Sequence, residues 1–161
     1  MFGHRGPGRT QAGPPRSPLT SAELHAVRRA ARAVARAAKA GDPDRRATRF
    51  ADLQSLLAEV RERRGDHPVL WELEADFTAD PAIAADLYRR AEKAASGALL
   101  PTLSIRLSLA RLLLKELGHP GEARAALLAC AGELSDASEK QSAAWAELLA
   151  TCEERMDTPT P

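Results

Sequence analysis

Residues 101–130, PTLSIRLSLARLLLKELGHPGEARAALLAC, decide the fold class of this chain. Pro101 and Pro120 each suit the first turn of a helix, where a backbone N–H has no partner to lose, and Gly118 suits a helix end. Leucine and isoleucine surround most of the first half, which is typical of a helix enclosed by other helices. The stretch therefore predicts two helices joined by a short turn, with the first at the centre of an all-helical fold.

The same signals divide the rest of the chain. Thr20 with Glu23, and Ser138 with Gln141, are capping-box pairs that open a helix. Elsewhere a polar residue before proline opens a helix, and glycine closes most of them. The predicted helices span about 21–40, 43–64, 68–79, 81–97, 101–117, 120–134 and 139–156. Short turns between helices favour antiparallel neighbours, so we expect hairpins over 20–64, 68–97 and 101–134, a capping helix over 139–156, and a frayed tail over 157–161.

Composition agrees with packed helices. The 161 residues are 44% hydrophobic but only 4% aromatic, so most apolar side chains are Ala and Leu. Two cysteines are too few for a disulfide-stapled scaffold, and no apolar run approaches the roughly 18 residues of a membrane span. The Ala- and Arg-rich usage is typical of a GC-rich bacterial genome, and we expect a cytoplasmic protein without a transmembrane segment.

The charges are unevenly distributed although the formal net charge is only +1. Residues 1–41 carry eight bases and one acid, a charge of +7, whereas residues 42–161 carry 15 bases and 21 acids, a charge of −6. Residues 1–19 are rich in Gly and Pro and are predicted to be a disordered basic arm. They contain no apolar core of a secretory signal, while a mitochondrial-type presequence stays an alternative.

The first predicted helix, 21–40, has a basic face. At ~100° per residue, one arc of about 100° contains His25 together with Arg28, Arg29, Arg32, Arg36 and Lys39. Three interpretations stay open: a solvated outer face, a docking surface for an acidic partner or for the chain's own acidic body, and a phosphate-binding surface. No motif for reading base edges accompanies these cations.

Two segments share a pattern of small, large and small residues at spacings of +4 and +3: Ala84, Tyr88 and Ala91, then Ala123, Leu127 and Cys130. A second pattern places apolar residues at spacings of +3 and +7. It occurs in Leu70, Leu73 and Phe77 and again in Trp145, Leu148 and Cys152. Helix starts at Pro68, Pro101 and Ser138 are 33 and 37 residues apart. In these features residues 68–156 resemble the tetratricopeptide repeat family, whose period is about 34 residues. The resemblance implies a superhelical α-solenoid that binds partners without catalysis.

In that family the first helix of each hairpin lines the concave surface. The resemblance therefore implies that the polar stripe of helix 101–117 contacts a partner, and this stripe consists of Ser104, Ser108, Arg111 and Lys115. A merely solvated stripe is the alternative. Trp71 is interpreted as a packing residue or, if exposed, as a peptide anchor.

Catalysis finds little support in the sequence. No pair of His or Cys residues has CxxC or HxxxH spacing, so no metal or cofactor is predicted. Cys130 and Cys152 lie on apolar stripes and are expected in the core. Glu72, Asp76 and Asp80 form a carboxylate row at helical spacing, which we interpret as a solvated face with nothing nearby to raise a pKa.

The predicted function is a non-catalytic protein–protein interaction scaffold. An adaptor, a chaperone-like holder and an inhibitory or immunity-type binder all fit, each seating a peptide or helix of another protein in a shallow groove. The alternative is nucleic-acid or anionic-surface binding through the basic arm and the first helix. Association of the chain with itself stays open.

Overall fold

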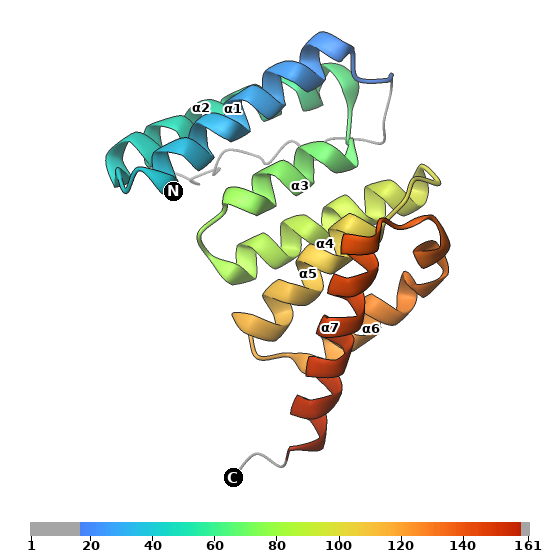
Figure 1. The fold of residues 1–161 in the computed structure, drawn as a ribbon. Helices are drawn as coiled ribbons and strands as arrows, with labels where there is room; N and C mark the ends of the chain where they lie inside the picture. Colours follow the sequence, from blue (N-terminus) through green and yellow to red (C-terminus); the bar gives the residue numbers. More distant parts are fainter. Residues whose placement is uncertain (1–16, 159–161) are drawn as a thin grey trace, which may run out of the picture.

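The structure is a computed structural model that describes residues 17–158, and this part of the chain consists of helices joined by short turns, without a strand (Figure 1). The predicted all-α class is therefore confirmed. The helices are α1 (Ser21–Lys39), α2 (Pro43–Arg64), α3 (Pro68–Phe77), α4 (Pro81–Gly97), α5 (Leu103–Lys115), α6 (Pro120–Ala129), the 3₁₀-helix η1 (Ala131–Asp136) and α7 (Glu139–Asp157).

Local side-chain caps begin α1, α2, α4 and α7, as the sequence predicted. The Thr20 Oγ1 accepts from the Glu23 backbone N–H at 3.1 Å, and Glu23 accepts in return from the Thr20 N–H at 2.9 Å. Ser138 and Gln141 make the same reciprocal pair at the start of α7. Such caps satisfy N–H groups that the helix itself leaves without partners.

Two predicted helices are shorter than expected, because α5 begins at Leu103 and α6 ends at Ala129. Residues 131–136 form η1 instead, and this turn brings the Glu133 carboxylate to the start of α5. Glu133 accepts from the N–H groups of Thr102 and Leu103, each at 2.8 Å, and from the Thr102 hydroxyl at 2.6 Å. The cap of α5 therefore comes from a residue 31 positions further along the chain.

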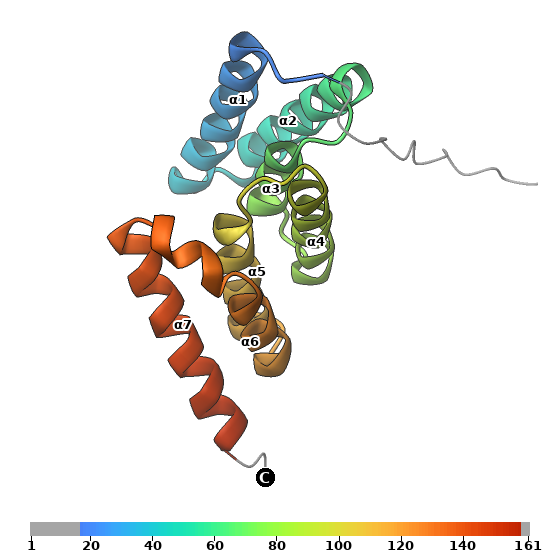
Figure 2. The same ribbon diagram turned by 90° about the vertical axis from the view of Figure 1, so that its right-hand side faces the viewer.

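The helices pack in chain order. α1 pairs with α2, α3 with α4, and α5 with α6, while α7 packs on α6 and α5. α3 contacts both helices of the first pair, and α4 contacts α5. The pairs follow one another from α1–α2 at the top of Figure 1 to α7 at the bottom, and Figure 2 shows α1 to the left of α2 and α3 to the left of α4.

The buried side chains form two clusters. The first joins α1, α2 and the start of α3 through Val27, Ala31, Val34, Leu53, Leu57, Val60 and Leu70. The second extends from Trp71 and Ala75 of α3 through α4, α5 and α6 to Leu148 and Cys152 of α7. The prediction that α5 is enclosed is confirmed, because seven of its residues are buried: Leu103, Ile105, Leu107, Leu109, Ala110, Leu113 and Leu114.

The predicted disordered arm, 1–19, lies mostly outside the described residues, and so do 159–161 of the predicted frayed tail. Residues 17–19, at the end of that predicted arm, contact the helical part of the chain. The Ser17 hydroxyl accepts from Arg64 at 3.2 Å, and the Ser17 carbonyl contacts the His67 ring nitrogen Nε2 at 2.8 Å. Leu19 packs against the first cluster. At the other end Asp157, the first residue of the predicted tail, belongs to α7.

Candidate functional site

The first candidate site is a polar surface where α3, α4 and α5 meet. It is formed by Glu72, Asp76, Tyr88, Ser104, Ser108, Arg111 and Lys115. The four α5 residues follow one another at +4, +3 and +4, so they share the one side of α5 that its buried leucines leave free. Ser104, Arg111 and Lys115 are exposed and Ser108 is partly exposed, so the structure places the predicted stripe at the surface.

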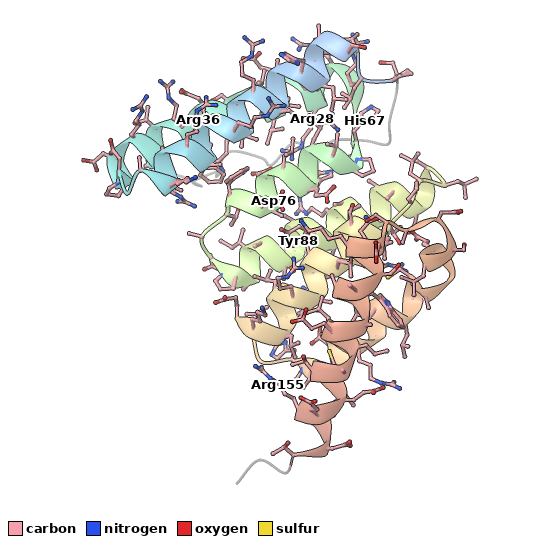
Figure 3. The ribbon with its side chains drawn as sticks, viewed as in Figure 1. Arg28, Arg36, His67, Asp76, Tyr88 and Arg155 are labelled. Carbon is pink, nitrogen blue, oxygen red and sulfur yellow. The ribbon has the colours of Figure 1, made fainter. Side chains whose placement is uncertain are left out.

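Hydrogen bonds join the three helices at this surface. The Ser104 hydroxyl donates to Glu72 Oε1 at 3.2 Å. The Tyr88 hydroxyl donates to Asp76 Oδ1 at 2.6 Å, and Figure 3 labels these two residues. Burial raises the pKa of Glu72, and the charge of Asp76 raises it further. Desolvation also raises the pKa of Asp76, against the effect of the bond from Tyr88. The expectation that nothing near this carboxylate row raises a pKa is therefore wrong.

The third carboxylate of the row has a different role. Asp80 caps α4, since its Oδ1 accepts from the backbone N–H groups of Ala82 and Ile83 at 2.9 and 3.0 Å. Its position before Pro81 made this role visible in the sequence. The row is thus divided between a helix cap and two members of the polar surface.

Arg111 and Lys115 are the cations of the polar surface. Neither Arg111 nor Lys115 forms an ion pair with any residue of 17–158. Lys115 is in the last turn of α5, where a positive charge is favourable beside the helix dipole. The surface consequently offers carboxylates on α3 and free cations towards the end of α5.

Trp71 lies apart from this surface. Its side chain is in the second core cluster, and the residue is only 9% exposed. The Arg61 guanidinium stacks 3.6 Å from the centre of the ring, and that of Arg90 is 5.2 Å away. Arg61 is itself held by Glu74 at 2.8 Å. Of its two predicted roles, the structure supports packing, because core residues and guanidinium groups leave little of the ring for a peptide.

The second candidate site is the arginine groove, a hollow of about 640 Å³ between α1 and α2. Its floor consists of alanines from one face of α1 and from its C-cap, spaced alternately by +4 and +3: Ala26, Ala30, Ala33, Ala37 and Ala40. Its rims are Arg29 and Arg36 on α1 and Arg45 and Arg49 on α2. Arg46, between the last two, turns to α3 instead and donates to the Phe77 carbonyl at 3.0 Å.

The predicted basic face is exposed in all five of its Arg and Lys positions. None of them forms an ion pair within the described part of the chain. The structure divides this face, because Arg29 and Arg36 line the groove while Arg28, Arg32 and Lys39 do not. Figure 3 labels one residue of each kind, Arg36 and Arg28, on α1. The regular spacing of the alanines in 26–40 is the signal for this groove in the sequence. The prediction for α1 considered its charged residues and did not include these alanines.

The cysteines are core residues, as predicted. Cys130 and Cys152 are both free thiols with at most 1% exposure, and burial raises the pKa of each. Within residues 17–158, no three His, Cys, Asp or Glu side chains are grouped so that they could hold a metal ion. In the same range no helix combines the length and the apolar character needed to cross a membrane.

No protein-family model, curated protein or solved structure matches the chain. The resemblance to tetratricopeptide repeats therefore depends on the sequence pattern alone.

Proposed function

We propose that this chain is a non-catalytic protein–protein interaction scaffold that holds a peptide or helix of another protein on its polar surface. One observation carries the proposal: α5 is enclosed on every side except the stripe that presents Arg111 and Lys115, and these cations have no ionic partner within residues 17–158. The buried side chains of α5 hold this helix in place. Its unpaired cations are therefore available to bind a second molecule.

The enclosure of α5 favours binding for an entropic reason. Because the buried leucines fix the helix, its exposed side chains start from a restricted set of positions, and less freedom is lost when a partner binds. The adjacent carboxylates of Glu72 and Asp76 add the opposite sign. A surface with both signs selects a partner segment with a complementary order of charges.

The family resemblance supports the same function, because tetratricopeptide repeats bind partners through the first helices of their hairpins, and α3 and α5 are first helices in this chain. The solenoid arrangement, the cytoplasmic location and the bacterial origin remain predictions. The partner is described only by its chemistry, a peptide or helix with charges of both signs.

The test compares two double variants in affinity purification, followed by titration of the purified partner. Arg111→Glu with Lys115→Glu reverses the cations of the polar surface, and Lys93→Glu with Lys140→Glu makes the same charge change at exposed positions outside it. We expect the partner to be lost with the first variant and retained with the second. Equal retention by both variants would exclude the polar surface.

The exposed cations of α1 favour a second candidate function, binding to a nucleic acid or an anionic surface. Five phosphate contacts would give a log–log salt slope of roughly −4 to −5 on duplex DNA, and replacing Arg28, Arg32 and Arg36 by Ala would flatten it by about three. Fluorescence anisotropy at several salt concentrations measures this slope. We expect only weak, non-specific binding, because α1 offers no side-chain pattern for reading bases. A sequence-selective complex of nanomolar affinity would reverse the ranking of the two functions.

A further inference from the structure

The outer face of α7 combines small side chains with acidic ones. Ala143, Ala146 and Ala150 are exposed at spacings of +3 and +4, on the opposite side of the helix from Leu148 and Cys152, which are buried. Five exposed acids lie on or beside this outer face, and one of them, Glu153, already pairs with Arg124 at 3.7 Å. The other four are Glu139, Glu147, Glu154 and Asp157. Lys140 is the one base at its margin.

The arginine groove has the converse character, an alanine floor between arginine rims. It lies at the α1–α2 end of the molecule, while α7 forms the other end (Figures 1 and 2). The two surfaces of one chain are therefore too far apart to meet. We propose that the arginine groove receives the outer face of α7 from a second copy of this chain.

Packing supports this occupant. Alanine opposite alanine lets two helix axes approach to the short end of the usual 8–10 Å range, so the backbones gain dispersion contacts along the groove. A phosphate backbone has no apolar surface to cover such a floor. An acidic helix with alanines at its centre fills the floor and reaches the rims.

The charges also match in register. Arg29 and Arg36 are seven residues apart, and so are Glu147 and Glu154. At 1.5 Å per residue, each pair spans about 10.5 Å along its helix, so both ion pairs form in the same alignment. Arg29, Arg36 and Arg45 have no ion pair within residues 17–158, so docking does not require an existing pair to break.

The contact is heterologous, because it joins the groove of one copy to α7 of the next. Each added copy leaves one groove and one α7 unoccupied, so assembly continues beyond two copies unless a ring closes. The polar surface on α3–α5 takes no part in the contact. The inference is therefore independent of the proposed function, and each can fail without the other.

The test is sedimentation velocity on the full chain, from micromolar to millimolar concentration and at low and high salt. We expect the average mass to rise with concentration past that of a dimer at low salt, and high salt to reverse the rise, because exposed ion pairs are screened. Arg29→Glu with Arg36→Glu, and separately Glu147→Lys with Glu154→Lys, should each weaken the association at least about tenfold, because both ion pairs become repulsive.

Two further variants make the test specific. Arg28→Glu with Arg32→Glu has the same charge change as the groove variant, on the same helix but outside the groove, and should associate like the parent. The quadruple variant R29E/R36E/E147K/E154K exchanges the two charge patterns at unchanged net charge, and should recover the association. Circular dichroism checks that all variants keep their helices.

A parent chain that stays monomeric at every concentration would overturn the inference. So would an equal effect of the R28E/R32E control, or a quadruple variant that fails to associate. If the parent stays monomeric and the groove instead binds an acidic peptide or DNA, the inference is also overturned, and the proposed function of the polar surface is unaffected.

Discussion

Replacement of Glu133 by Ala should destabilise the protein because Glu133, which lies in η1, caps the start of α5. At the start of α5, the Glu133 carboxylate accepts hydrogen bonds from three donors: the Thr102 N–H, the Leu103 N–H and the Thr102 hydroxyl. Thr102 is only 5% exposed, so water does not readily replace the lost acceptor. A buried donor left without an acceptor costs about 1–3 kcal/mol, and relaxation of the surrounding structure recovers part of that cost. Loss of a helix N-cap costs about 0.5–2 kcal/mol.

From these values we expect Glu133→Ala to lower the free energy of unfolding by about 2–3 kcal/mol. For a protein of this size that lowers Tm by about 5–10 °C. Glu133→Gln should cost less, about 1 kcal/mol, because an amide oxygen still accepts from the two N–H groups and only the charge assistance is lost. Thermal and urea unfolding followed by circular dichroism at neutral pH measure both values.

The effect should depend on pH with a definite sign. Burial opposes ionisation of Glu133, but the bonds from Thr102 and Leu103 and the charge of Arg106 outweigh it, so the pKa lies below its ordinary value. A lowered pKa stabilises the fold above the unfolded value of about 4.3, and this stabilisation disappears as pH falls through the folded value. The difference between parent and Glu133→Ala should therefore shrink below about pH 4.

The matched control is Asp136→Ala, which removes the same charge from an exposed position in the same 3₁₀-helix and should change stability by no more than about 0.5 kcal/mol. If Glu133→Ala and Asp136→Ala unfold alike, the account of capping across the fold is refuted.

Three further predictions concern strain, enclosure and burial. Leu99 is 93% exposed and has a φ of +57°, which is strained for a leucine. Leu99→Gly should therefore raise the free energy of unfolding by about 0.5–1 kcal/mol, measured as a higher urea midpoint. An unchanged or lower midpoint would contradict this. Leu109→Asp places an unpartnered charge in the enclosed helix and should cost more than about 3 kcal/mol, whereas a variant that melts like the parent would show that α5 is not central. A thiol reagent should label Cys130 and Cys152 only slowly until urea is added, and reductant should leave Tm unchanged; rapid labelling of native Cys152 would show that α7 detaches readily.

The sequence predicted the features of the fold that short spacings encode. Capping boxes, a proline after a polar residue and a glycine at a helix end all act within a few residues, so most predicted helix bounds agree with the structure. The Thr20 box and the start at Pro43 are examples. The exposure of the α5 stripe followed from helical periodicity in the same way.

Contacts between distant residues were not predictable in this way. The Glu133 cap joins residues 31 positions apart, and the bond from Tyr88 to Asp76 joins two helices through their relative rotation. The arginine groove exists only because Arg45 and Arg49 of α2 lie beside the alanines of α1. Periodicity gives the side of a helix on which a residue lies but not what stands opposite.

The position of α3 between the two core clusters limits how this protein can be divided and recombined. The turn at 65–67 separates two hairpins in the sequence and looks like a natural junction for exchanging modules. A cut there, however, would take Leu70 away from Leu53 and Leu57, and would also separate Arg61 from Glu74. The smallest transferable N-terminal unit therefore includes α3, and a chimaera joined after Phe77 would inherit one complete cluster and expose the side of α3 that carries Trp71 and Ala75.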